Sequence, residues 1–164
     1  METKSLSFRA HVITVSDGVS AGTREDLSGP ALENLLRNAQ FEVSGPEVVP
    51  DDHQRICDAL VAAVVAGSDL VLTTGGTGLG PRDVTPQATS MLIDYEVPGI
   101  AELMRRAGAA TTPMAALSRG LAGVRGQSLI LNVPGSMRGA TESLEAVLPV
   151  LAHAMQLLHG DTKH

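Results

Sequence analysis

Residues 70 to 85 run Leu70-Val71-Leu72-Thr73-Thr74, then Gly75-Gly76-Thr77-Gly78-Leu79-Gly80, then Pro81-Arg82-Asp83-Val84-Thr85. The opening apolar run is typical of a strand buried on both faces of a parallel sheet. The loop after it holds four glycines in six residues, and glycine leaves room for backbone N–H groups to approach an anion. Ligands bind at the carboxyl ends of the strands in open α/β sheets. This stretch therefore predicts a site for a phosphate-bearing ligand.

The glycine loop matches neither of the two common phosphate-binding motifs. Gly75 and Gly80 have the spacing of a Walker A loop, but Pro81-Arg82 stands where that motif has Lys and Ser or Thr. The dinucleotide fingerprint Gly-x-Gly-x-x-Gly also fails, because Gly76, Gly78 and Gly80 are each two residues apart. The loop is therefore either a different phosphate cradle or only a tight turn.

Strand and helix patterns alternate along the chain and predict an α/β fold. Strands are expected at 9–15, 41–49, 69–74 and 128–133, and helices at 28–39, 53–66, 85–93, 100–107 and 136–158. Ser28 is the expected N-cap of the first helix, after a long loop over 19–28. Residues 115–125 fit either a short strand pair or irregular structure. Strands separated by helices imply right-handed crossovers and a mainly parallel sheet covered on both faces.

Composition narrows the class of protein. The chain has 164 residues, is 43% hydrophobic and carries a net charge of −6, which predicts one packed domain (8–160) with flexible termini (1–7 and 161–164). Scattered basic residues and three aromatic residues argue against nucleic-acid binding. The single cysteine, Cys57, favours a reducing cytoplasm. No secretory leader is expected at the start, and no membrane-spanning run occurs.

The loops that follow the strands bring acidic residues to one edge of the predicted sheet. These loops carry the carboxylates of Asp17, Asp51, Asp52 and Asp83 and the hydroxyls of Ser16, Thr74, Thr77 and Ser136. Carboxylates beside an anion cradle would repel a bare phosphate. Mg²⁺ resolves the conflict, because it binds one or two carboxylates together with substrate phosphates. The pattern therefore points to a complex of Mg²⁺ with a nucleotide or a similar ligand.

An ordered set of short motifs resembles the MogA/MoaB family of molybdenum-cofactor biosynthesis. The segment 73–78 followed by Arg82-Asp83-Val84-Thr85-Pro86 resembles the family signature. Further landmarks lie in order along 12–158: Val15-Ser16-Asp17, Pro50-Asp51-Asp52, Pro98-Gly99, Leu117-Ser118-Arg119 and Asn132-Val133-Pro134-Gly135-Ser136. The chain departs from the family at Gly18, where members often carry a larger or charged residue. If that residue touches the ligand, Arg24 is one candidate to replace it.

The resemblance implies a three-layer αβα sandwich, usually a homotrimer, and the activity of a molybdopterin adenylyltransferase. Such an enzyme converts MgATP and molybdopterin into adenylyl-molybdopterin and pyrophosphate. Two other functions stay open: a molybdopterin carrier or scaffold without catalysis, and an unrelated nucleotide hydrolase. A transient contact with a molybdenum-insertion enzyme is also expected, with no nucleic-acid or membrane partner.

On this basis, Asp51 and Asp83 are the expected catalytic residues and Mg²⁺ ligands. The expected ligand-binding residues are Ser16, Asp17, Thr74, Gly75, Gly76, Thr77, Gly78, Ser118, Asn132, Pro134, Gly135 and Ser136. Structural roles compete with these assignments: Asp51, Asp52, Asp83 and Ser136 each stand where a helix N-cap is common, and Asn132 could simply satisfy backbone groups. We expect Asp52 to be a cap, and Ser136 to combine capping with ligand binding.

Overall fold

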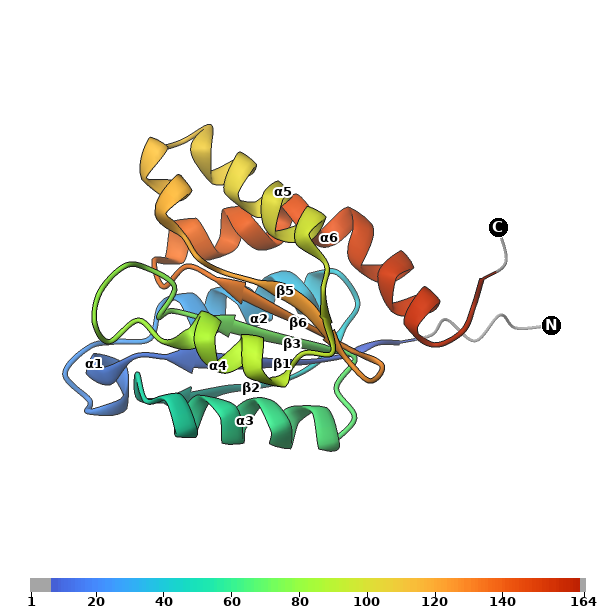
Figure 1. The fold of residues 1–164 in the computed structure, drawn as a ribbon, viewed down its shortest axis with the longest axis horizontal. Coiled ribbons are helices and arrows are strands. Elements are labelled where there is room, and N and C mark those ends of the chain that lie inside the picture. Colours follow the sequence, from blue (N-terminus) through green and yellow to red (C-terminus); the bar gives the residue numbers. More distant parts are fainter. Residues whose placement is uncertain (1–6, 163–164) are drawn as a thin grey trace.

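The computed structural model describes residues 7–162 and forms three layers (Figure 1). The termini expected to be flexible fall mostly in residues 1–6 and 163–164, which lie outside the described residues. In chain order the elements are β1 (Arg9–Val15), α1 (Asp17–Ser20), α2 (Ser28–Asn38), β2 (Glu42–Val49), α3 (His53–Val65), β3 (Leu70–Thr74), α4 (Thr85–Leu92), β4 (Tyr95–Glu96), α5 (Pro98–Ala109), the 3-10 helix η1 (Pro113–Leu117), β5 (Ala122–Arg125), β6 (Ser128–Val133) and α6 (Met137–Leu158).

The sheet confirms the expected mainly parallel architecture and adds two strands to it. Its order is β2-β1-β3-β6-β5-β4, and the first four strands are parallel. The segment 115–125, which the sequence left open, contains η1 and then β5, which pairs antiparallel with β6. The expectation of four strands was therefore too low, because β5 and the two-residue β4 are too short to carry a strand pattern.

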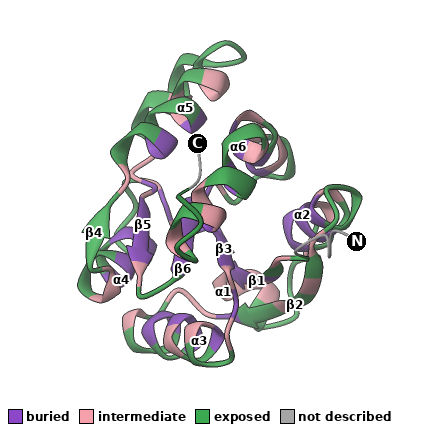
Figure 2. Cartoon of the chain, turned by 90° about the vertical axis from the view of Figure 1, so that its right-hand side faces the viewer, coloured by how far each residue is buried: buried purple, intermediate pink, exposed green. Residues whose placement is uncertain are grey.

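The core has two halves, one on each face of the sheet, and Figure 2 shows helices on both faces. Leu70 and Leu72 of β3 pack with buried residues of α2, α5 and α6, whereas Val71 between them packs with α3 and α4. Successive strand residues point to opposite faces, so a continuous apolar run serves both halves. The three helices α2, α5 and α6 thus cover one face, and α3 and α4 cover the other.

Two helix starts test the expected caps. Asp52 caps α3 as expected, because its Oδ1 accepts a hydrogen bond from the Arg55 N–H at 2.9 Å. The Ser28 cap was wrong: Ser28 is the first residue of α2, and Asp26 Oδ1 accepts from the Gly29 N–H at 3.0 Å instead. The expected loop over 19–28 also begins with the last residues of the short helix α1.

Candidate active site

The strand order creates a crevice between β1 and β3. These strands are neighbours, but α2 follows β1 onto one face while α4 follows β3 onto the other. At such a switch point the two connections diverge and leave a ligand-sized opening at the carboxyl edge. A cavity of about 640 Å³ lies here, which we call the larger cavity. Its wall includes Thr14, Val15 and Ser16 from the end of β1 and 74–78 from the end of β3.

The glycine loop is held in a conformation that requires glycine at two positions. Gly75 and Gly76 have φ angles of 104° and 67°, a region that other residues rarely adopt. A Cβ on Gly75 would also collide with the Val15 carbonyl oxygen, and one on Gly76 would collide with the Thr85 hydroxyl. The loop is therefore a tight turn, and the turn brings its backbone to the wall of the larger cavity.

Arg119 holds the glycine loop in place through hydrogen bonds from its side chain and its backbone. Its guanidinium donates to the carbonyl oxygens of Gly78 at 2.8 Å and Asp83 at 2.7 Å, and its backbone N–H donates to the Thr77 carbonyl at 2.8 Å. Leu117-Ser118-Arg119 resembles a family landmark, but the sequence alone predicts no role for Arg119. Nothing in its spacing could have revealed one, because Arg119 is far from the loop along the chain.

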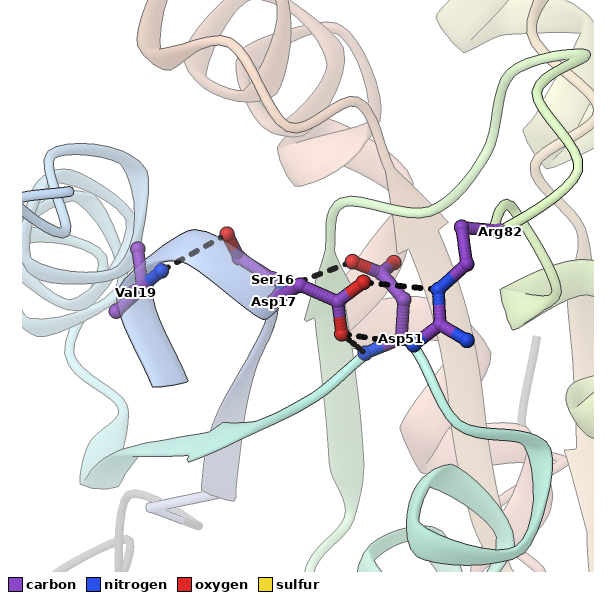
Figure 3. Close-up of polar contacts among 5 residues, drawn as sticks. All are labelled: Ser16, Asp17, Val19, Asp51 and Arg82. Carbon is purple, nitrogen blue, oxygen red and sulfur yellow. Dashed lines mark hydrogen bonds and ion pairs between the residues drawn. The ribbon is translucent and has the colours of Figure 1, made fainter. Parts of the chain in front are cut away.

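Asp17 and Asp51 form a hydrogen-bonded cluster with Arg82 (Figure 3). The Asp17 N–H donates to Asp51 Oδ2 at 2.9 Å, and the Asp51 N–H donates to Asp17 Oδ1 at 3.0 Å. The Arg82 guanidinium binds both carboxylate oxygens of Asp17, at 2.9 and 3.0 Å. Asp51 lines the larger cavity, whereas Asp17 does not. Arg82 therefore neutralises Asp17, and Asp51 is the acidic residue of this pair that lies at the cavity wall.

The pKa values of the two carboxyl groups in this cluster are shifted in opposite directions. The hydrogen bond from Arg82 holds the pKa of Asp17 below its ordinary value. Burial raises the pKa of Asp51, and the negative charges of Asp17 and Asp83 raise it further. A cation bound beside Asp51 would stabilise its ionised form.

Asp83 faces the same cavity from the other side of the glycine loop. Its Oδ2 accepts a hydrogen bond from the Gly80 N–H at 2.9 Å, and α4 begins two residues later without a side-chain cap. The remaining oxygens, Oδ1 of Asp83 and Oδ1 of Asp51, carry no hydrogen bond among residues 7–162. No group of three or more His, Cys, Asp or Glu side chains in that range is arranged to hold a metal ion. Two carboxylates with free oxygens nevertheless fit Mg²⁺, which takes its other ligands from phosphates and water.

Ser136 stands between the larger cavity and a second one. Its Oγ accepts from the Gly139 N–H at 3.1 Å, which confirms the expected cap of α6. The second, smaller cavity has a volume of about 330 Å³ and lies among α5, η1 and the start of α6. Thr77, Gly78 and Ser136 line both cavities. The two cavities are therefore neighbours that share part of their wall.

The expected site residues divide between the two cavities. Ser16, Asp51, Thr74, Gly75, Gly76, Asp83 and Gly135 line only the larger cavity, and Ser118, Asn132 and Pro134 line only the smaller one. Asp17 lines neither. The apolar part of the smaller cavity, including Met104 and Leu117, was missed, because its residues come from separate elements and show no pattern along the chain.

Asn132 is committed to a buried hydrogen-bond network. Its Nδ2 donates to the hydroxyls of Thr73 and Thr89 at 2.9 Å each, and its Oδ1 accepts from the Leu121 N–H at 3.1 Å. Asn132 is 1% exposed. Thr74 is similarly occupied, since its hydroxyl donates to the Pro134 carbonyl at 2.8 Å. Both side chains fix the strand ends that carry the site.

Fold and cavities together define a class: an αβα domain with a ligand-binding crevice at the carboxyl edge of a mainly parallel sheet. The family model described as "Probable molybdopterin binding domain" matches residues 11–153, and the chain belongs to this family.

Bacterial proteins resemble this chain in sequence, and a solved bacterial structure resembles it in fold. The chain is 41% identical to the molybdopterin adenylyltransferase of Escherichia coli, over 94% of this chain and 80% of the relative. It is 42% identical to a molybdenum cofactor biosynthesis bifunctional protein of Synechococcus elongatus, over 92% of this chain, but spans only 47% of that protein. The crystal structure of the molybdopterin biosynthesis enzyme MoaB from Thermus thermophilus superposes with a TM-score of 0.88 at 56% identity, covering 93% of this chain and 97% of that one.

Proposed function

We propose that this chain is a molybdopterin adenylyltransferase that joins the AMP part of ATP to molybdopterin and releases pyrophosphate. Relatives with this name are about 40% identical over most of the chain. The observation that carries the proposal is the pair of cavities with a shared wall, because adenylylation must align two different anionic substrates. The larger cavity takes the nucleotide, and the smaller, more apolar one takes the pterin.

The reaction needs alignment more than covalent catalysis. An oxygen of the molybdopterin phosphate attacks the α-phosphorus of ATP and forms the new P–O bond. The bond from that phosphorus to the bridging oxygen of the β-phosphate breaks, and its electron pair leaves with pyrophosphate. Positioning supplies much of the rate enhancement in such transfers. Ser136 and the first N–H groups of α6 hold the pterin phosphate, and the glycine loop with Thr77 holds the nucleotide phosphates.

Asp51 and Asp83 are the proposed Mg²⁺ ligands in this arrangement. When bound, Mg²⁺ offsets the negative charge on the phosphates and on the two carboxylates. Both residues line the larger cavity, and the charge of Asp83 already raises the pKa of Asp51. Asp52 is not assigned this role, because it caps α3 and lines neither cavity.

Three finer features accompany the proposal. A homotrimer, a cytoplasmic location and transient contact with a molybdenum-insertion enzyme are what the family resemblance implies. Within the described residues, no helix has the length and apolar character needed to cross a membrane.

Pyrophosphate release tests the proposed function directly. The purified protein is incubated with molybdopterin, ATP and Mg²⁺, and pyrophosphate and adenylyl-molybdopterin are measured. The proposal predicts equal amounts of both products, and none when molybdopterin is omitted. Bound pterin without pyrophosphate would indicate a carrier instead. ATP turnover without pterin would indicate a nucleotide hydrolase.

The variant Asp83→Asn tests the catalytic role within the same assay. Its side-chain amide oxygen can still accept the Gly80 N–H, so the loop is kept while the charge is lost. The rate should fall by at least about 100-fold, while pterin binding persists. Asp94→Asn is the matched control, because Asp94 also accepts a loop N–H, from Gly126 at 2.8 Å, but lies outside both cavities. Full activity of Asp83→Asn would remove Asp83 from the mechanism.

A further inference from the structure

Acidic side chains outnumber basic ones at the wall of the larger cavity. Glu25, Asp26, Asp51 and Asp83 line it, and among the described residues Arg24 is the single Lys or Arg side chain that does. An acidic cavity is a poor site for a nucleotide unless cations offset its field. Whether the Arg24 guanidinium is already paired therefore decides if it can offset the charge of a phosphate ligand there.

Nearby arginines already have partners, but Arg24 does not. Arg82 is paired with both carboxylate oxygens of Asp17, and Arg119 donates to backbone carbonyls and to Gln87. The Arg24 side chain makes no hydrogen bond or ion pair with any residue in 7–162. Its guanidinium therefore keeps all its donors available at the wall of the cavity.

The backbone around Gly18 sets where Arg24 lies. The Gly18 carbonyl accepts from the N–H groups of Thr23 and Arg24, at 2.9 and 3.1 Å, and from the Thr23 hydroxyl at 3.2 Å. These bonds close the turn after β1 and bring Arg24 over Gly18. A Cβ on Gly18 would lie 3.3 Å from Arg24 Cβ and 3.8 Å from its Nε. The Arg24 side chain thus passes next to the position that a Cβ on Gly18 would occupy.

We propose that Arg24 binds the phosphate chain of the nucleotide and that Gly18 provides the space for its side chain. This inference rests on the proposed function, because it takes ATP as the ligand of the larger cavity. A guanidinium can form two parallel hydrogen bonds to a phosphate. Arg24 is exposed at the cavity wall, so its guanidinium is accessible to such a ligand. Arg24 lines the larger cavity and not the smaller one, so its ligand is the nucleotide and not the pterin phosphate.

Direct binding measurements on the full chain test this assignment. Isothermal titration calorimetry gives dissociation constants for MgATP, adenosine and molybdopterin. Arg24→Gln should weaken MgATP binding on the order of 10-fold or more, because a hydrogen bond to a charged group is lost, and should leave adenosine and molybdopterin unchanged. Arg24→Lys keeps the charge without the planar fork, so its loss should be smaller. Gly18→Ala should weaken MgATP binding less than Arg24→Gln, because a Cβ 3.3 Å from Arg24 Cβ only shifts Arg24 slightly.

Arg106→Gln is the matched control, because Arg106 is an exposed arginine of α5 that lines neither cavity. Equal MgATP affinity in wild type and Arg24→Gln would overturn the inference while leaving the proposed function intact. Weaker molybdopterin binding with unchanged MgATP binding would also overturn it. A wild-type protein that fails to bind MgATP would refute the proposed function and the inference together.

Discussion

Asp17 and Asp51 exchange hydrogen bonds, each backbone N–H donating to the carboxylate of the other residue. The exchange joins the turn after β1 to the turn after β2, which are 34 residues apart along the chain. Two acidic side chains in such proximity repel each other unless a cation intervenes. Arg82 supplies a cation for Asp17, and the proposed Mg²⁺ supplies one for Asp51.

The raised pKa of Asp51 predicts a pH dependence of metal-assisted nucleotide binding. Protonated Asp51 cannot ligate Mg²⁺, so MgATP binding should weaken as the pH falls through its pKa, which lies above the ordinary aspartate value. Arg82 lowers this pKa. Arg82→Gln should therefore move the midpoint of the loss to higher pH, which titrations at a series of pH values would reveal. A midpoint that moves to lower pH, or that moves equally in Arg106→Gln, would contradict the cluster's role.

Ser136 combines a structural role with a proposed ligand contact, and two substitutions separate them. Ser136→Ala removes the cap of α6 and should lower the free energy of unfolding by about 1 kcal/mol. Ser136→Asp keeps a good cap but adds a negative charge to the wall that both cavities share. We expect near wild-type stability in urea denaturation and severely reduced pyrophosphate release. An active Ser136→Asp protein would show that no phosphate lies against this residue.

Asn132 is expected to act through stability and not through ligand contact. Asn132→Ala leaves the Leu121 N–H and two threonine hydroxyls without their partner, and should cost about 2–4 kcal/mol in the free energy of unfolding. Asn34→Ala, an exposed position on α2, is the control and should change stability by less than about 0.5 kcal/mol. If Asn132→Ala is as stable as wild type but no longer binds molybdopterin, the side chain contacts the ligand.

Gly75 tests the glycine loop as a tight turn. Gly75→Ala combines an unfavourable φ with a collision against the Val15 carbonyl, so we expect a loss of about 3 kcal/mol or more. Gly22 also has a positive φ, of 76°, but nothing within 4 Å of its Cβ position. Gly22→Ala should therefore cost only about 1 kcal/mol. Equal losses in thermal or urea unfolding would show that the close approach to Val15 contributes nothing.

The sequence predicted the parts of the fold in which one local signal dominates. The apolar run 70–74 and the Asp52 cap are examples, because burial on both faces and N-cap chemistry each leave a direct mark. Ser28 misled, because it precedes Pro30 at a helix start just as Asp26 does, and the tertiary bond from Thr14 to Asp26 at 2.8 Å is invisible in sequence. The antiparallel edge of the sheet forms because β5 pairs with β6 and β4 pairs with β5. The local sequence of these two short strands does not signal that pairing.

Parts of the candidate site whose residues lie close together in the sequence could be predicted. Parts that the fold assembles from distant segments could not. Glycines and carboxylates after strands signalled the larger cavity. Arg119 and the apolar wall of the smaller cavity gave no such signal, because they meet the loop only through the packing of α5, η1 and α6. The pairing of Asp17 with Arg82 likewise depends on a contact between residues 65 positions apart.

A crystal structure of the protein with Mg²⁺ and a non-hydrolysable ATP analogue tests the central claim most directly. The account predicts one Mg²⁺ ion at ~2.1 Å from oxygens of the analogue's phosphates and from Asp51 and Asp83, or linked to them through its water ligands. An ion held by phosphates and water alone, with the two carboxylates ~10 Å or more from it and pointing into solvent, far beyond the ~2.1 Å of direct ligation, would contradict it.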